Sequence, residues 1–356
     1  MGPFGRGQGG FSRDEWTAAG RCVHRHLTDR TMVPGTESSY AVVRVDVDGR
    51  PATLLIYHEH WQHYVQILGE AMSASLVIGP LDRLASEITG VLCWKIPATV
   101  LARLPNLRWI QVTSSGTDQL TDFLASVGSR PRVASVRGMN AESVAQFVML
   151  SILAHHWELP TLLERQRHRE WTWHSAVPLD RMTCGIIGLG SIGQKVAHYA
   201  STMGMRVIGS RRRVGGRVDG VDRLFGPEHL EELLGEADYV VLTVPLTPAS
   251  RGLIGAAQIR AMKASAVLVN VARGGVVDEV ALRTALEEER LRGASVDVTE
   301  AEPLPPDDPL WAAPRLILTP HTAGERSDHR EAVAAIWIEN IRRFMAGSLL
   351  RNELTP

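Results

Sequence analysis

The segment CGIIGLGSIGQKVA, residues 184–197, places three glycines between an apolar run and an amphipathic run. The apolar run predicts a buried strand and the amphipathic run a helix, so the glycines occupy a strand–turn–helix connection. Gly188 permits a tight turn, Gly190 lets phosphates approach the backbone at the helix N-terminus, and Gly193 lets the helix pack closely on the strand. The pattern predicts a dinucleotide-binding fold and leaves a ligand-free glycine turn as the weaker alternative.

The end of the next apolar run indicates which dinucleotide is bound. The run MRVIGS ends at Ser210, about 20 residues after the glycines, where an NAD-specific site carries an acid that bonds the ribose 2′-OH. Arg211 and Arg212 follow, and their guanidinium groups can pair with a 2′-phosphate, whereas we expect Arg213 to be solvated. Because the chain has only three lysines and is rich in arginine, the absence of an acid at position 210 is stronger evidence than the presence of arginines after it. We predict a preference for NADP(H), with NAD(H) possible.

The bulk composition excludes several classes of protein. A chain of 356 residues with 44% hydrophobic and 22% charged residues is typical of a soluble protein with two domains. A formal net charge of -1 gives no reason to expect nucleic acid or membrane as a partner, and no run of about 18 apolar residues predicts a membrane span. Widely spaced cysteines (Cys22, Cys93, Cys184) and an N-terminus without an apolar signal core predict a cytoplasmic protein.

Short apolar runs alternate with helix-like runs from residue 52 onward, and the alternation restarts at residue 183. Apolar runs that alternate with helices are typical of parallel sheets covered by helices, so we predict two α/β domains. One continuous helix is predicted over residues 141–168, and a last one near the C-terminus. Residues 1–50, rich in Gly, Arg and Ser, are predicted to form a partly disordered extension.

Two histidine-containing segments raise the possibility of a metal site. CVHRH has no second pair of ligands at a suitable spacing, and HEHWQH is better explained as a polar loop that leads into an amphipathic helix. We therefore predict no metal at either segment, whose candidate ligands are Cys22, His24 and His26 in the first and His58, Glu59, His60 and His63 in the second.

Six motifs occur together in a fixed order: SSGTDQL, GLGSIG, VPLTPASRGLIG, VARGGVVDE, DVTEAEPLP and TPHTAG. From about residue 52 to its end, the chain resembles the D-isomer-specific 2-hydroxyacid dehydrogenase family. The resemblance implies NAD(P)H-dependent reduction of a small 2-oxo acid, such as glyoxylate or hydroxypyruvate, to a D-2-hydroxy acid. It also implies a Rossmann-type doubly wound parallel sheet, residues 136–321, inserted into a flavodoxin-like α/β substrate domain formed by residues 51–135 and 322–356.

The family resemblance assigns three catalytic roles. Arg273 matches the arginine that binds the substrate carboxylate, and its planar fork suits a bidentate pair with that group. His321 matches the general acid–base residue, which supplies the proton that the nascent alkoxide needs. Glu302 matches the carboxylate that orients the imidazole and favours its protonated form.

Other positions matching the family are expected at the cofactor or the substrate. The resemblance implies that Asp297 bonds the nicotinamide carboxamide and that backbone N–H groups of Ser115 and Gly116 hold the substrate carboxylate. Trp94 and Lys95 are expected to face the cleft, and a homodimer is expected to use the segment of Trp171 and Trp173. The remaining cofactor-binding candidates are Ser191, Ile192, Thr243, Val244, Pro245 and Ala272.

The same motifs leave two alternative functions open. A corepressor-like protein that senses dinucleotide retains this fold, although no obvious docking extension is present beyond the N-terminal segment. Formate and phosphite dehydrogenases share the scaffold, but the formate enzymes resemble a pattern with Gln where this chain has Glu302. Gln146 also departs from the family, which often has Glu at that position, and so places one expected contact in doubt.

Overall fold

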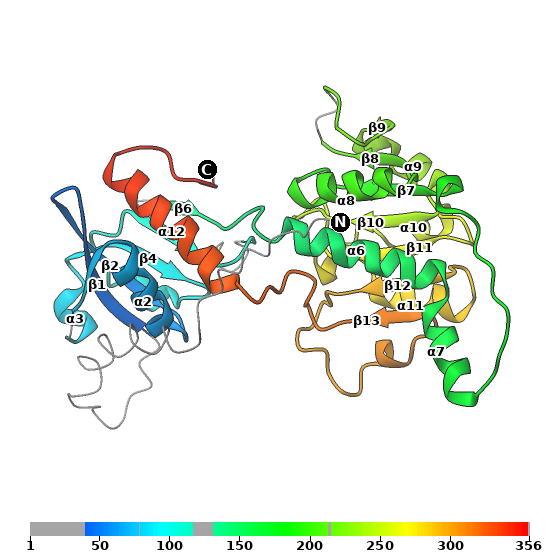
Figure 1. Ribbon diagram of the computed structural model, residues 1–356, viewed down its shortest axis with the longest axis horizontal. Coiled ribbons are helices and arrows are strands. Elements are labelled where there is room, and N and C mark those ends of the chain that lie inside the picture. The colour runs from blue at the N-terminus through cyan, green and yellow to red at the C-terminus, as the bar shows by residue number, and fades with distance from the viewer. Residues whose placement is uncertain (1–39, 78, 117–130, 213–214, 355–356) are drawn as a thin grey trace, which may run out of the picture. The chain divides into compact units, whose positions relative to one another are not determined.

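The computed structural model describes residues 40–77, 79–116, 131–212 and 215–354 (Figure 1). The predictions made for the extension before residue 40, for the CVHRH segment and for Arg213 lie outside the described residues. Two β-sheets organise the rest, and each is described by itself. No helix among the described residues is both long enough and apolar enough to cross a lipid bilayer.

The first sheet has six strands in the order β3-β1-β2-β4-β5-β6. Four of them are parallel, namely β2 (Arg50–Tyr57), β4 (Ile88–Cys93), β5 (Trp109–Val112) and β6 (Arg132–Ala134). β1 (Tyr40–Val47) is antiparallel to both β2 and β3 (Ser73–Val77). The helices that accompany this sheet are α2 (Trp61–Ala71), α3 (Leu81–Leu84), α4 (Ala98–Leu101) and α12 (His329–Met345).

Strand β1 corrects the prediction of an extension through residue 50. Val43 and Val45 are buried in the core of the sheet, and β1 turns into β2 through Asp48 and Gly49. These two residues have φ angles of 54° and 74°, which is the geometry of the tight hairpin turn that Asp-Gly favours. The strand also separates β2 from β3, which would be neighbours in the flavodoxin-like order.

The second sheet has seven parallel strands in the order β13-β12-β11-β10-β7-β8-β9. The strand order reverses between β7 (Thr183–Ile187) and β10 (Tyr239–Leu242), as in a doubly wound Rossmann fold. The predicted fold class is therefore confirmed. The other strands are β8 (Arg206–Ser210), β9 (Arg223–Phe225), β11 (Val267–Asn270), β12 (Gly293–Val296) and β13 (Leu316–Leu318).

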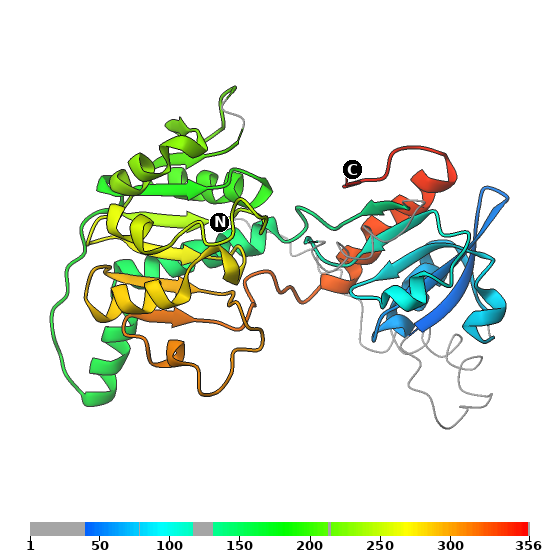
Figure 2. The same cartoon turned by 180° about the vertical axis from the view of Figure 1, so that it is seen from behind.

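Helices cover both faces of the second sheet. α6 (Ala141–His156) and α8 (Ser191–Thr202) bury their apolar residues on the face seen in Figure 1. The opposite face, in front in Figure 2, is covered by α9 (Leu230–Glu236), α10 (Ala256–Ala261) and α11 (Glu279–Glu287). Four short 3₁₀ turns complete this part, at Leu179–Arg181, Pro227–His229, Gly274–Val276 and Pro309–Ala312.

The single helix predicted over residues 141–168 is two helices. α6 ends at His156, and α7 (Leu159–His168) begins after Glu158, which adopts a left-handed conformation with φ 49°. Pro160 lies in the first turn of α7 and cannot continue a preceding helix, because its ring would clash with the carbonyl four residues earlier. The proline was the signal that the periodicity argument overlooked.

The C-terminal helix belongs to the first sheet rather than to the second, which it follows in the chain. Trp337 and Ile341 of α12 are buried in one cluster with Ile56 of β2 and Trp109 of β5. Residues 182–318, which contain the whole second sheet, therefore interrupt the chain between β6 and the helix that completes the core of the first sheet.

Candidate active site

The glycine turn after β7 separates positions that packing requires from one that it does not. A Cβ on Gly188, which has φ +103°, would lie 2.8 Å from Cγ1 of Val244. A Cβ on Gly193 would lie 2.0 Å from the carbonyl oxygen of Gly188, so α8 could not approach the strand. A Cβ on Gly190 would meet nothing within 4 Å, and φ is an ordinary -77°. The fold itself therefore gives no reason for glycine at 190, where a ligand would approach.

The start of α8 fits the phosphates of a dinucleotide. Gly190 is the N-cap residue, and no side chain caps the helix. The first N–H groups of a helix have no partner within it, so they and the helix dipole attract an anion. Ser191 is exposed in this first turn and Ile192 is half-buried beside it. These residues fit the pyrophosphate of NAD(P), which would supply the hydride-transfer chemistry when bound.

Two neighbouring strand ends meet at the glycine turn. The N–H of Gly188 donates to the carbonyl of Ser210 at 2.9 Å, and the Thr243 N–H donates to the carbonyl of Ile187 at 3.0 Å. The Thr243 hydroxyl also donates to the Gly188 carbonyl. The structure thus brings the predicted positions at the ends of β8 and β10, including Val244 and Pro245 directly after Thr243, to the same turn.

The arginines after Ser210 differ in their surroundings. The guanidinium of Arg211 donates to the carbonyls of Gly215 and Gly216, the second at 3.0 Å, and so closes its own loop. Its Nε is buried without a hydrogen-bond partner among the described residues. Arg212 is exposed. Of the two, Arg212 is the one whose charge is presented to solvent.

The loop that carries Arg273 is shaped by its neighbours. Asn270, buried at the end of β11, accepts a hydrogen bond from the Ala272 N–H at 3.0 Å and donates to the Arg273 carbonyl at 3.1 Å. A Cβ on Gly274 would lie 2.0 Å from the carbonyl carbon of Thr299, so only glycine lets this loop pack on the loop after β12. Sequence reasoning missed Asn270, although its place at a strand end three residues before Arg273 was a usable signal.

His321 and Glu302 form a pair. Nδ1 of His321 lies 2.8 Å from Oε2 of Glu302, and the other carboxylate oxygen accepts the Thr299 N–H at 3.1 Å. The carboxylate on Nδ1 leaves Nε2 as the atom that can exchange a proton with a ligand. The His321 and Glu302 side chains are 48% and 40% exposed, so the pair is accessible from solvent.

Asp297 organises the loop that carries His321. Its side chain is 2% exposed and accepts three hydrogen bonds, from the Thr319 hydroxyl at 2.6 Å and from the N–H groups of Thr322 and Ala323, both at 2.9 Å. The His321 N–H also donates to the Asp297 carbonyl at 2.8 Å. A carboxylate has about four acceptor positions, so about one remains for the carboxamide contact predicted from the family.

The predicted substrate-domain residues lie on the first sheet, at the carboxyl ends of neighbouring strands. Ser115 and Gly116 follow β5, whereas Trp94 and Lys95 follow β4. Trp94 and Lys95 are exposed, and Nζ of Lys95 lies 4.6 Å from the Trp94 ring centroid. Carboxyl ends of parallel strands are where open α/β sheets bind ligands.

The described residues contain no group of three or more His, Cys, Asp or Glu side chains arranged to hold a metal ion. His58, in the HEHWQH segment, instead accepts the His60 N–H on Nδ1 at 3.1 Å. Burial, followed by the nearby His60, lowers the pKa of His58 to about 4. At neutral pH it is therefore a neutral side chain.

A seven-stranded doubly wound sheet with a glycine turn at the reversal of strand order, and an Arg/Glu/His set at its carboxyl edge, defines an NAD(P)-dependent oxidoreductase. Residues 149–323 match the family model described as "D-isomer specific 2-hydroxyacid dehydrogenase, NAD binding domain". The chain belongs to the D-isomer-specific 2-hydroxyacid dehydrogenase family. It is an NAD(P)-dependent enzyme of that family, acting on 2-oxo and 2-hydroxy acids.

Individual relatives agree with this assignment. The chain is 35% identical over 281 residues to a glyoxylate reductase of Korarchaeum cryptofilum, covering 76% of this chain and 82% of the relative. It is 32% identical over 271 residues to glyoxylate/hydroxypyruvate reductase B of Escherichia fergusonii, covering 74% and 82%. A similar solved structure is the NADPH-dependent glyoxylate/hydroxypyruvate reductase of Sinorhizobium meliloti in complex with NADP and sulfate, with a TM-score of 0.70, 28% identity and coverage of 76% and 85%.

Proposed function

We propose that this enzyme reduces a small 2-oxo acid of the glyoxylate or hydroxypyruvate type to the D-2-hydroxy acid, with His321 as the proton donor. The observation that carries the proposal is the 2.8 Å pair of His321 and Glu302, held on loops that pack beside the Arg273 loop. The names of the glyoxylate and hydroxypyruvate reductases that the chain resembles support the substrate class.

Each of the three side chains has a defined task in this proposal. Arg273 binds the carboxylate of the 2-oxo acid with its guanidinium fork and polarises the adjacent ketone. Glu302 holds Nδ1 of His321, so that Nε2–H points to the ketone oxygen and delivers a proton as negative charge develops there. A dinucleotide held at the glycine turn after β7 would supply the hydride.

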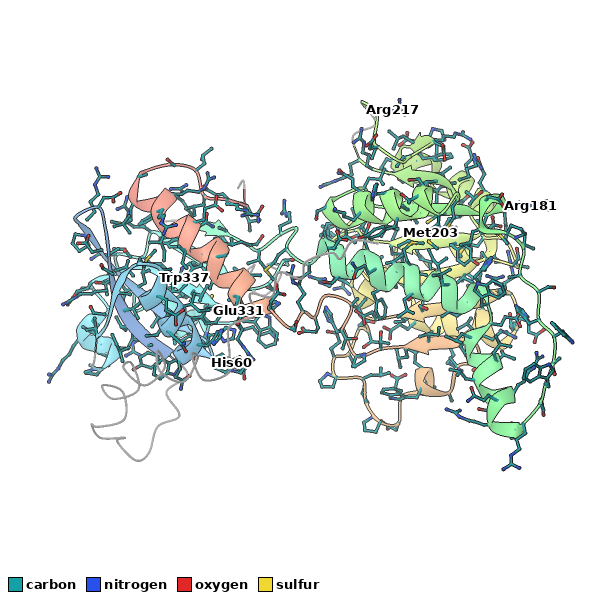
Figure 3. All side chains as sticks on the ribbon, in the orientation of Figure 1. His60, Arg181, Met203, Arg217, Glu331 and Trp337 are labelled. Atoms are coloured by element: carbon teal, nitrogen blue, oxygen red, sulfur yellow. The ribbon has the colours of Figure 1, made fainter. Side chains whose placement is uncertain are left out.

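Steady-state kinetics of the full chain test this proposal. We expect oxidation of NADPH with glyoxylate, hydroxypyruvate or a related 2-oxo acid, and a loss of at least about a hundredfold in kcat/KM for Arg273→Ala, because an ionic contact to the reacting carboxylate is removed. Arg181→Ala is the matched control, since Arg181 lies exposed at the surface, on the 3₁₀ turn before β7 (Figure 3). No oxidation with any 2-oxo acid, or an equal loss in the control, would refute it.

We also propose that NADP(H) is preferred over NAD(H). Ser210 stands where an acid would repel a 2′-phosphate, and Arg212 is exposed immediately after it. Because Arg211 closes its own loop, Arg212→Ala should cost more NADPH affinity than Arg211→Ala, while NADH affinity changes little. Fluorescence titration with both nucleotides measures this directly. A preference of the wild type for NADH, or no loss of NADPH affinity in the double variant Arg211→Ala/Arg212→Ala, contradicts the proposal.

The assembly and the domain limits complete the proposal. Trp171 and Trp173 are 93% and 90% exposed, and exposed apolar side chains of this kind indicate a protein interface. We expect a homodimer that becomes monomeric in Trp171→Ser/Trp173→Ser but not in the control Trp311→Ser, measured by light scattering after size exclusion.

The substrate domain then comprises residues 51–135 and 322–356 with β1 added, and residues 136–321 form the dinucleotide-binding domain.

A further inference from the structure

The described segments at the ends of three neighbouring strands of the first sheet contain two basic residues and no acidic one. These segments, called strand exits below, are residues 94–97 after β4, residues 113–116 after β5 and residues 135–138 after β6. They contain two basic residues, Lys95 and Arg137, and neither Asp nor Glu. Arg137 has been given no role by the family motifs or by the mechanism proposed above.

The hydrogen bonds place these two residues on either side of the loop that contains Ser115. The Thr113 N–H donates to the Cys93 carbonyl at 2.9 Å, which ties this loop to β4 two residues before Lys95. On the other side, the Val136 N–H donates to the Ser114 carbonyl at 3.3 Å and the Ser115 hydroxyl to the Val136 carbonyl at 3.5 Å, one residue before Arg137. Neighbouring strands lie about 4.8 Å apart, so lysine and arginine side chains at both exits are long enough to reach the central loop.

The backbone of Arg137 is fixed while its charge is left available. Its N–H donates to the Ser135 hydroxyl at 3.3 Å, and its carbonyl accepts from the Asn352 side chain at 2.8 Å. The adjacent acid in the C-terminal segment, Glu353, is occupied by a bidentate pair with Arg132 at 2.8 and 2.6 Å. Within the part of the chain that the structure describes, the guanidinium of Arg137 is exposed and has no acceptor.

We propose that Arg137, assisted by Lys95, forms a second anion subsite beside the Ser115–Gly116 loop, and that the enzyme prefers 2-oxo acids with a second anionic group, a carboxylate or a phosphate. This inference rests on the proposed function, and on the role that the family resemblance implies for the backbone N–H groups of Ser115 and Gly116 at the first carboxylate. The guanidinium fork of Arg137 binds the distal anion in a bidentate manner, and the Lys95 ammonium adds a point charge from the other side. A substrate without the distal group leaves the two cations solvated and gains nothing from them.

Matched pairs of substrates isolate the distal charge. The kcat/KM values of the full chain are compared for 2-oxoglutarate against 2-oxopentanoate, which have the same carbon chain, and for phosphohydroxypyruvate against hydroxypyruvate. We expect at least one dianion to exceed its monoanionic partner by about tenfold or more, because hydrogen bonds to charged groups are among the strongest in proteins. The pair that shows the preference identifies the distal group as carboxylate or phosphate.

Variants then assign the preference to its residue. Arg137→Gln should remove most of the dianion preference and change the monoanion kcat/KM by less than about threefold, and Lys95→Gln should reduce the preference partly. Arg83→Gln is the control, since Arg83 is exposed on α3, which precedes β4 at the other end of the strand. Raising the ionic strength should weaken dianion turnover more than monoanion turnover.

The failures are distinguishable. If monoanionic 2-oxo acids are reduced without any preference for their dianionic partners, or if Arg137→Gln lowers both members of a pair equally, the subsite is refuted and the proposed function stands. If no 2-oxo acid of either kind is reduced, the proposed function is refuted, and the subsite falls with it.

Discussion

Replacing Gly190 by alanine tests whether the glycine turn holds a ligand. The added Cβ would meet no atom of the protein within 4 Å, and the φ of -77° suits alanine. Alanine restricts the unfolded chain more than glycine does, which stabilises the folded protein by about 0.4–1 kcal/mol. Alanine is also a poorer N-cap than glycine, which destabilises the folded protein by a similar amount. We therefore expect the free energy of unfolding to change by less than about 0.5 kcal/mol.

Dinucleotide binding should respond very differently. The methyl group would occupy the space through which the pyrophosphate reaches the first N–H groups of α8. Losing one such hydrogen bond to a charged group costs about 1.5–3 kcal/mol, so the Kd for NADPH should rise by about ten- to a hundredfold or more.

Two measurements on each variant decide the outcome. Urea unfolding reports the stability of the apoprotein, and nucleotide fluorescence reports the Kd for NADPH. Gly193→Ala is the comparison, because its Cβ would lie 2.0 Å from the Gly188 carbonyl oxygen and should destabilise the apoprotein by at least about 1–3 kcal/mol. Unchanged NADPH affinity in a stable Gly190→Ala protein would refute the assignment of this turn to the cofactor.

Three further predictions concern side chains of the second sheet. Burial lowers the pKa of His155 to about 4, so the unfolded state binds more protons than the folded state between pH 6.5 and 4. The free energy of unfolding should therefore fall by about 2 kcal/mol between pH 8 and pH 5. Urea unfolding of His155→Gln should lack this pH-dependent component. An equal pH dependence in both proteins would contradict it. Thr319→Val removes the 2.6 Å bond to the buried Asp297 carboxylate, so it should lower the free energy of unfolding by about 1.5–3 kcal/mol and kcat by about tenfold, whereas unaltered kcat would show that this bond does not position the histidine loop. Glu302→Gln keeps the shape but removes the charge beside His321, so kcat should fall by about a hundredfold in a stopped-flow assay; full activity would exclude the pair from proton transfer.

Local signals with a strict steric meaning predicted the second sheet well. The glycine spacing indicated a turn whose Gly188 and Gly193 the structure shows to be sterically required, and the strand order around that turn agrees with the doubly wound fold. The errors arose where one short signal was overlooked within a longer pattern. Asp48-Gly49 specifies a hairpin inside a segment whose composition suggested disorder, and Pro160 ends a helical periodicity that otherwise continues.

The sequence does not show which hydrogen-bond partner each polar group has. Arginine content alone does not show that Arg211 bonds the carbonyls of its own loop, while Arg212 stays exposed. Likewise Asn270 and Thr319 become informative only when the structure shows that they bond the loops of the predicted active-site residues. Hydrogen-bond partners far apart in the chain depend on the register of strands, which a single sequence does not determine.

The loop of His321 supports the proposal that the carboxyl edge of the second sheet is the reactive one. His321 has a φ of 54°, a conformation that is uncommon for non-glycine residues although histidine adopts it more often than most. Asp297 holds this backbone, because its carbonyl accepts the His321 N–H and its carboxylate accepts the N–H groups of Thr322 and Ala323. Glu302 fixes the imidazole ring through Nδ1. Packing does not require this, since the imidazole is half-exposed. The proton transfer proposed for His321 would account for an exposed imidazole that is held in this conformation with Nε2 left open.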